Sequence, residues 1–135
     1  KHRIHESMER VDEAIALSAM YAANHLEGVR AIICMTETGA TPRLMSRIKS
    51  SLPIFAFSRH HSTQHRVALF RGVQTVPFDS AKIANEQTNA NAVAELKRMG
   101  VVKEDDLVVI TKGDYVNAQG GTNTMKIVRV GADIR

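Results

Sequence analysis

The sequence predicts an α/β fold, a three-layer α/β/α sandwich around a mixed five-stranded sheet in which four strands are parallel and the last is antiparallel. Short apolar runs alternate with helical patterns along the chain, which is typical of a parallel sheet covered by helices on both faces. The connection to the last strand lacks room for a crossover helix, so that strand should return antiparallel to the one before it. With 135 residues, the chain is long enough for one domain with a buried core.

The first element is an alanine-rich helix. We expect residues 1–6 to be a hinge or tail from a preceding domain and residues 7–135 to form the domain itself. Ser7 is the expected N-cap and Gly28 the expected C-cap of this helix. Its inner face is expected to contain residues at helical spacing, namely Val11, Ile15, Ser18, Ala22 and Leu26, with Ala14, Leu17 and Ala19 widening the stripe. The many alanines make a slim helix that is able to pack closely on a sheet or on another subunit.

The central stretch of the chain reads AIICMTETGATPR. Residues 31–35 predict a buried strand, residues 36–41 a hydroxyl-rich glycine loop, and Pro42 the first turn of a helix. This order of elements directs backbone N–H groups toward one spot and therefore favours an anion such as phosphate. The simpler alternative is that Thr41 only caps the helix and Gly39 only turns the chain.

The remaining elements follow the same alternation. We expect a helix carrying residues 44–48 and ending near Ser50, a strand at 53–57, a short helix capped by Ser62, strands at 73–77, 107–110 and 124–130, and a longer helix that ends at Met99 before Gly100. Asn85, Asn89 and Asn91 are expected on the solvated face of that longer helix. The loops at 36–41, 58–61 and 112–122 all leave carboxyl ends of strands, where ligands bind in such folds, so they should converge on one pocket.

Composition argues against several classes of function. The formal net charge is +4, but the basic residues are scattered and aromatic residues are few, so we expect no nucleic-acid partner. Nor do we expect a membrane span or a signal peptide. The one cysteine, Cys34, lies in a predicted buried strand, which fits a cytoplasmic protein and an inert thiol. His61 and His65 are four residues apart but have no flanking ligands, so a surface pair is favoured over a metal site.

Four segments occur in a familiar order and spacing. They read EAIALSAMYAANHLEGVRAII (13–33), MTETGATPRLMSRIKSSLPIFAFSR (35–59), ALFRGVQTV (68–76) and GDYVNAQGGTNTMKI (113–127). Through them, essentially the whole chain resembles the C-terminal domain of pyruvate kinase. The MYAANHL segment resembles bacterial forms that are regulated by sugar monophosphates or AMP.

The resemblance implies a regulatory and oligomerisation domain. In this family, other domains of the enzyme transfer a phosphoryl group from phosphoenolpyruvate to ADP with Mg²⁺ and K⁺. This domain would contain no catalytic residue, metal or cofactor, and would form part of a homotetramer. The effector site that the resemblance implies comprises Thr36, Glu37, Thr38, Gly39, Ala40, Thr41, Arg59, Gln119, Gly120 and Gly121.

The chain also departs from the family pattern. Many members have Lys where this chain has Glu37, and Arg or Lys where it has Ala40; Thr88 lies roughly where bisphosphate-binding members have an arginine, and the chain contains no tryptophan. Each lost cation removes charge-assisted hydrogen bonds worth about 1.5–3 kcal/mol. The sequence therefore favours a monophosphate over a bisphosphate. Arg43, Arg59 or Lys112 is expected to supply the missing charge.

Two alternatives remain at the sequence level. One is a stand-alone domain of the same fold that binds phosphate or another small molecule. The other is a small independent enzyme that uses His60, His61 or Asp114 at the strand ends. The sequence contains no recognisable acid–base pair or activated nucleophile, so we expect this chain alone to be inactive as a phosphotransferase.

Overall fold

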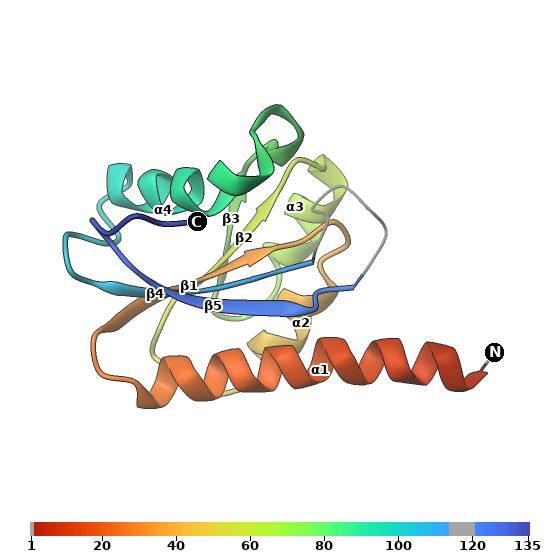
Figure 1. Cartoon of the computed structure of the whole chain (residues 1–135). Coiled ribbons are helices and arrows are strands. Elements are labelled where there is room, and N and C mark those ends of the chain that lie inside the picture. Colours follow the sequence, from red (N-terminus) through yellow and green to blue (C-terminus); the bar gives the residue numbers. More distant parts are fainter. Residues whose placement is uncertain (1, 114–120) are drawn as a thin grey trace.

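The computed structural model describes residues 2–113 and 121–135, which form one sheet with helices on both faces (Figure 1). The strand order is β3-β2-β1-β4-β5. Neighbouring strands among β1 to β4 are parallel, and β5 is antiparallel to β4, which confirms the predicted fold class. The bounds are β1 Val29–Met35, β2 Ile54–Ser58, β3 Val73–Pro77, β4 Leu107–Lys112 and β5 Thr124–Arg129.

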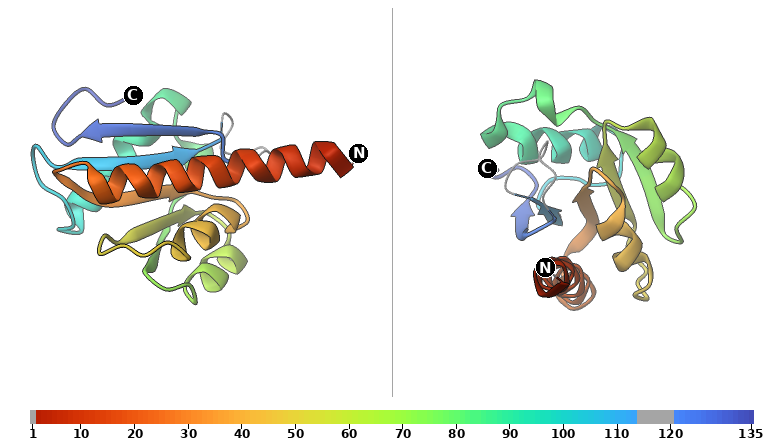
Figure 2. Two further views of the ribbon diagram at one scale, coloured as in Figure 1. Left: turned by 90° about the horizontal axis from the view of Figure 1, so that it is seen from below. Right: turned by 90° about the vertical axis from the view of Figure 1, so that its right-hand side faces the viewer.

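The helices form the two outer layers. α1 (His2–His25), α2 (Ala40–Ser46) and α3 (His61–Val67) cover one face, and α4 (Thr88–Arg98) covers the other (Figure 2). Two 3₁₀ turns, η1 (Ser80–Lys82) and η2 (Asn85–Gln87), precede α4.

Alternate residues of the central strand divide the core between these layers. In β1, Ile32 and Cys34 pack toward α1–α3, whereas Ala31 and Ile33 pack toward α4. This follows from the two-residue period of a strand. Because both faces are covered, the inner parallel strands β1, β2 and β4 contain continuous apolar runs, whereas the edge strand β3 does not.

The first helix differs from the expectation in its start and in its buried face. It begins at His2 rather than at a cap on Ser7, and Gly28 adopts its positive φ of 95° in the turn after the helix rather than directly at the helix end. Among the side chains of α1 that the structure describes, Ala16, Ala19, Met20 and Ala23 are buried. Of the expected inner face only Ala19 is among them, whereas Val11, Leu17 and Leu26 are exposed. Small side chains let the helix backbone approach the sheet closely, so the alanine face was preferred over the face with larger side chains. That residues 1–6 connect to a preceding domain stays a prediction.

The boundaries of the shorter helices also differ from those expected from the sequence. α2 ends at Ser46, so its last predicted turn is absent, although Ile48 still packs against the core. The backbone of His60, rather than Ser62, occupies the N-cap position of α3. The strand Val73–Pro77 is confirmed at both ends.

The end of α4 is confirmed. Gly100 has a φ of 80°, its N–H donates to the carbonyl of Lys97, and the N–H of Val101 donates to the carbonyl of Leu96. These two bonds define the Schellman motif, which favours glycine at this position. Asn89, by contrast, is 1% exposed and donates through Nδ2 to the carbonyl of Arg135, so the expected solvated position was wrong. Within the described residues, no helix is long and apolar enough to cross a membrane.

Candidate functional site

The strand order creates a switch point next to the central strand. The chain leaves β1 to build β2 and β3 on one side, then crosses to build β4 on the other side. In open α/β sheets, ligands bind at the carboxyl ends of strands where the winding direction reverses. The loop at residues 36–41, here called the glycine loop, follows β1 at this point.

Hydroxyl groups shape the glycine loop from within. The Gly39 N–H donates to Thr36 Oγ1 at 2.8 Å, and the Ala40 N–H donates to Thr38 Oγ1 at 3.3 Å. Gly39, with a φ of 89°, is the N-cap residue of α2. The alternative in which Thr41 caps the helix was therefore wrong, whereas the turning role of Gly39 is confirmed.

Thr41 instead links the glycine loop to the segment before β5. It is 2% exposed, and its hydroxyl donates to Thr122 Oγ1 at 2.7 Å. In the described part of the chain, the backbone N–H groups of Glu37, Thr38 and Thr41 have no hydrogen-bond acceptor. The side chains of Thr38 and Ala40 are exposed. The loop thus presents hydrogen-bond donors that are able to bind an anion.

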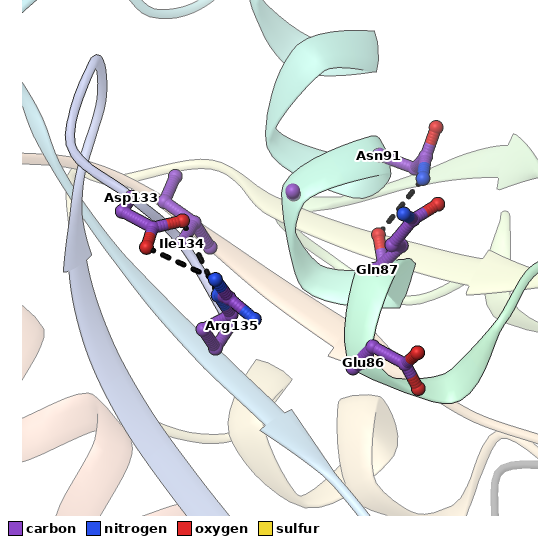
Figure 3. A pocket seen from close by; sticks show the side chains of 7 residues that line it. Glu86, Gln87, Asn91, Asp133, Ile134 and Arg135 are labelled. Carbon is purple, nitrogen blue, oxygen red and sulfur yellow. Dashed lines mark hydrogen bonds and ion pairs between the residues drawn. The ribbon is translucent and has the colours of Figure 1, made fainter.

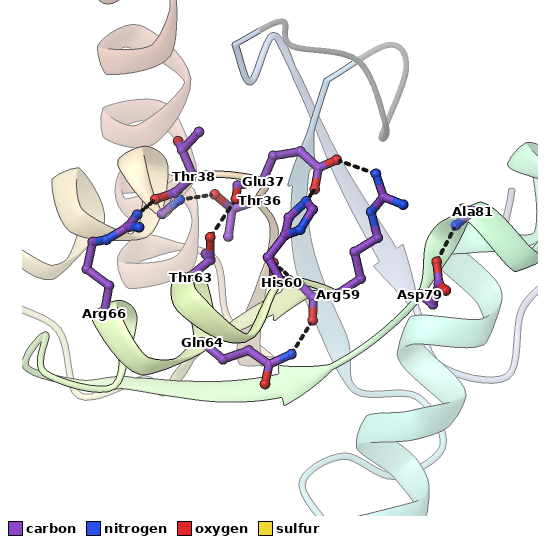
Figure 4. A network of polar contacts seen from close by, with 12 residues as sticks. Thr36, Glu37, Thr38, Arg59, His60, Thr63, Gln64, Arg66, Asp79 and Ala81 are labelled. Atoms are coloured by element: carbon purple, nitrogen blue, oxygen red, sulfur yellow. Dashed lines mark hydrogen bonds and ion pairs between the residues drawn. The ribbon is translucent and has the colours of Figure 1, made fainter.

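One face of α3 fixes the position of the glycine loop (Figure 4). Thr63 Oγ1 donates to the carbonyl of Glu37 at 2.6 Å, and Arg66 Nη1 donates to the carbonyl of Thr38. A Cβ on Gly39 would lie 2.9 Å from Val67 Cγ1, so only glycine allows this close approach. The loop is therefore held by contacts on successive turns of α3.

An ionic cluster joins the glycine loop to the end of β2. Glu37 Oε2 lies 3.0 Å from His60 Nε2, and Glu37 Oε1 lies 3.7 Å from Arg59 Nη2 (Figure 4). The carboxylate thereby compensates the charge of Arg59. Together with the Thr41–Thr122 bond, this cluster shows that described residues of the three strand-end loops contact one another, while the expectation that they form one pocket stays a prediction.

The other predicted site residues have different environments. A Cβ on Gly121 would lie 2.3 Å from Asp12 Oδ1, so the segment before β5 contacts α1. Gln119, Gly120 and Asp114 lie outside the described residues. Burial, with a smaller contribution from Lys126, lowers the pKa of Lys112. Thr88 is buried at the start of α4, on the opposite face of the sheet from α3.

Sequence reasoning missed two residues that position the loop, Thr63 and Arg66. Their spacing contained a usable signal, because Thr63, Arg66 and Val67 follow an i, i+3, i+4 pattern and must share one helix face. The direction in which that face points was not encoded locally. It depends on how α3 packs after β2 ends.

The structure offers little for metal or thiol chemistry. Among the described residues, no three His, Cys, Asp or Glu side chains form a group that could hold a metal ion. His61 and His65 are both exposed. Burial raises the pKa of the Cys34 thiol to about 12, so its nucleophilic thiolate form is disfavoured.

A separate groove lies between the start of α4 and the C-terminal segment (Figure 3). Its charged and polar groups largely bond to one another. Asp133 Oδ1 is 3.3 Å from Arg135 Nε, and Asn91 Nδ2 donates to the carbonyl of Gln87 at 2.8 Å. This groove is lined by none of the glycine-loop residues, so the switch point is the better candidate site.

The chain was compared with known proteins. Residues 13–128 match the family model "Pyruvate kinase, alpha/beta domain". Pyruvate kinase II of Salmonella typhimurium is 52% identical over 131 residues, which cover 96% of this chain and 27% of that protein. Pyruvate kinase of Geobacillus stearothermophilus is 35% identical over 125 residues, covering 93% of this chain and 21% of that protein. A solved pyruvate kinase of Cryptosporidium parvum superimposes with a TM-score of 0.75 at 33% identity, covering 95% of this chain and 25% of that one. The chain thus spans about a quarter of the length of these relatives.

Proposed function

The chain belongs to the pyruvate kinase alpha/beta domain family, and from this membership we propose that it is the regulatory and oligomerisation domain of a cytoplasmic pyruvate kinase. Its role is to bind a phosphorylated effector and to hold subunits together. Phosphoryl transfer from phosphoenolpyruvate to ADP, with Mg²⁺ and K⁺, belongs to the remainder of such an enzyme.

The meeting of three strand-end segments supports the effector site most directly. The glycine loop contacts the end of β2 through Glu37 and His60, and it contacts the segment before β5 through Thr41 and Thr122. Ligand contacts at this meeting point would bear on β1, β2 and β5 together. A ligand that binds two conformations of such a site with different affinity shifts their populations, which is the requirement for regulation.

The charge distribution supports a monophosphate rather than a bisphosphate. The glycine loop has backbone donors for one phosphate group. On the other side of the loop, Arg59 is already compensated by Glu37. A second phosphate placed there would meet a carboxylate, whereas the hydroxyl groups of a sugar or a nucleoside would donate hydrogen bonds to it. We therefore propose a sugar monophosphate or AMP as the effector.

Calorimetric titration tests this proposal. Glucose 6-phosphate, ribose 5-phosphate and AMP are titrated into the chain, and we expect at least one to bind. Ala40→Glu should abolish binding, because Ala40 is exposed in the loop and the new carboxylate would repel the phosphate. Thr41 is unsuitable for this substitution, since it is buried against Thr122. Binding that is unchanged in Ala40→Glu would place the ligand elsewhere.

The proposed subunit contact rests on α1 and β5. Val11, Leu17 and Tyr21 are 46%, 58% and 68% exposed on α1, which leaves an apolar surface on the outside of the domain. β5 is an edge strand, and its Ile127 is 42% exposed. We propose that this surface forms one interface of a homotetramer. Sedimentation velocity should detect a dimer of the chain that Leu17→Glu converts to monomer, and a wild-type monomer at high micromolar concentration would contradict a self-sufficient interface.

Activity measurements address the catalytic part of the proposal. The chain alone should show no turnover of phosphoenolpyruvate and ADP in the presence of Mg²⁺ and K⁺. Turnover that follows the chain through purification would contradict this expectation. A coding sequence for a barrel domain in frame with the chain would support a domain of pyruvate kinase and would exclude a stand-alone binding domain of the same fold.

A further inference from the structure

The glycine loop itself contains no cation, yet a phosphate monoester carries close to two negative charges at neutral pH. Backbone N–H groups alone leave that charge largely uncompensated. A cation from another element should therefore lie against the loop if the proposed function is correct. The basic side chains near the loop differ in their contacts.

We infer that Arg66 of α3 is the residue that neutralises the effector phosphate, an inference that rests on the proposed function. Arg66 Nη1 donates to the carbonyl of Thr38, so the guanidinium is held against the glycine loop. The position of a Cβ on Gly39 lies 3.8 Å from the same nitrogen. One bond to a neutral carbonyl leaves the positive charge uncompensated and most of the five N–H donors of the guanidinium available.

The three cations expected from the sequence are less suitable. Arg59 is compensated by Glu37. Lys112 is half-buried, and in the part of the chain that the structure describes its side chain makes no hydrogen bond to the glycine loop. Arg43 is exposed on α2, and within the described residues its hydrogen bonds are made by its backbone. Its N–H donates to the carbonyl of Gly39, and its carbonyl accepts from Ser46 Oγ.

The sequence around Arg66 is free of acidic residues. Residues 38–78 contain six arginines and lysines and no Asp or Glu. The glycine loop itself contains one acid, Glu37, and its carboxylate points to Arg59 and His60 on the side of the loop away from Arg66 (Figure 4). Arg66 thus adds positive charge at the Thr38 side of the loop, which favours an anion there.

The first experiment compares matched variants in calorimetric titrations of the chain with glucose 6-phosphate, ribose 5-phosphate and AMP. Arg66→Gln keeps an N–H donor for Thr38 but removes the charge, and it should weaken the tightest of these ligands roughly tenfold or more. Arg47→Gln, an exposed arginine just after α2, is the control and should leave the affinity unchanged. Thermal unfolding followed by circular dichroism verifies that each variant is folded.

A second measurement separates charge from loop positioning. The sulfate ester of the same sugar has the shape of the phosphate but one negative charge. If Arg66 compensates charge, Arg66→Gln should narrow the preference for phosphate over sulfate, and Arg66→Lys should largely retain it. If Arg66 only positions the loop, Arg66→Gln should lower the affinity for both esters by the same factor. That result would show that the inference is wrong.

The outcomes also separate this inference from the proposed function. If wild type binds a phosphate ester, Ala40→Glu abolishes binding and Arg66→Gln does not weaken it, the site stands and Arg66 is excluded as its cation. If Arg43→Gln lowers the affinity for the ester and Arg66→Gln does not, the cation that compensates the phosphate is Arg43 of α2. If wild type binds none of the three esters, the proposed effector site fails, and the role of Arg66 fails with it.

Discussion

The hydroxyl of Thr41 donates a hydrogen bond to the hydroxyl of Thr122 at 2.7 Å, joining the glycine loop to the segment before β5 across 81 positions of sequence. Both side chains are buried. This bond therefore fixes the distance between two walls of the proposed effector crevice, and its loss should be measurable as lost stability.

Thr41→Val keeps the shape of the side chain but leaves the Thr122 hydroxyl buried without its partner. We expect the free energy of unfolding to fall by about 1–3 kcal/mol, measured by urea denaturation. The double variant Thr41→Val/Thr122→Val should recover much of the loss, because two methyl groups then face each other. Strict additivity of the two single changes would show that the hydroxyls do not depend on each other.

Gly39→Ala should destabilise the domain through both backbone strain and a steric clash. The φ of 89° disfavours any L side chain, and the new Cβ would lie 2.9 Å from Val67 Cγ1. Gly72→Ala is the matched control, since Gly72 has a φ of 76° but open space around it. We expect Gly39→Ala to cost about 1–3 kcal/mol more than Gly72→Ala. If both variants lose the same free energy of unfolding, α3 can move away from the new Cβ at no energetic cost.

Asp12 should make stability fall as pH rises through the acidic range. Burial raises its pKa above the ordinary 3.8, and Oδ1 is buried without a partner in the described residues. Between 3.8 and the raised pKa, the unfolded chain ionises while the native carboxyl keeps its proton, so ionisation favours unfolding. Asp12→Asn should therefore be more stable than wild type at pH 7, and the difference should shrink toward pH 3. A difference that does not change with pH would contradict this account.

Asp106 should have the opposite pH dependence. The N–H of Lys103 donates to Asp106 Oδ2 at 2.9 Å, and this bond, with the charges of Lys103 and Arg30, lowers the pKa of Asp106 below 3.8. The carboxylate thus stabilises the native state above that value, and the contribution is lost as pH falls through the lowered pKa. Asp106→Asn should cost about 0.5–1 kcal/mol at pH 7, and this cost should shrink as the pH falls through the lowered pKa. Urea midpoints across this range test the sign.

The strands were predictable from the sequence because their signals are local. The apolar run at residues 31–35 lies within β1, and the following glycine loop begins where the strand ends. The parallel order followed from alternation with helices. The same reasoning placed the three loops at one edge of the sheet, and the contacts of Glu37 and Thr41 bear this out.

The features that the sequence did not reveal depend on packing between distant segments. Ala14, Ala16, Ala19 and Ala22 offer several equivalent inward faces on α1, and only contact with the sheet selects the one containing Ala16 and Ala19. Asn89 looked solvated because its partner, the carbonyl of Arg135, is 46 positions away. Likewise, Arg66 reaches Thr38 only because α3 packs beside the glycine loop.

Ala40→Arg should strengthen effector binding and extend it to bisphosphates. Ala40 is exposed in the glycine loop, so a longer side chain has room outside the fold. A guanidinium there would add charge-assisted hydrogen bonds to phosphate, worth about 1.5–3 kcal/mol or roughly tenfold to a hundredfold in affinity. Calorimetry with glucose 6-phosphate and fructose 1,6-bisphosphate measures both effects, and Ala40→Gln controls for side-chain length without charge. An affinity that is unchanged in Ala40→Arg, with the domain folded, would mean that the phosphate does not approach this side of the loop.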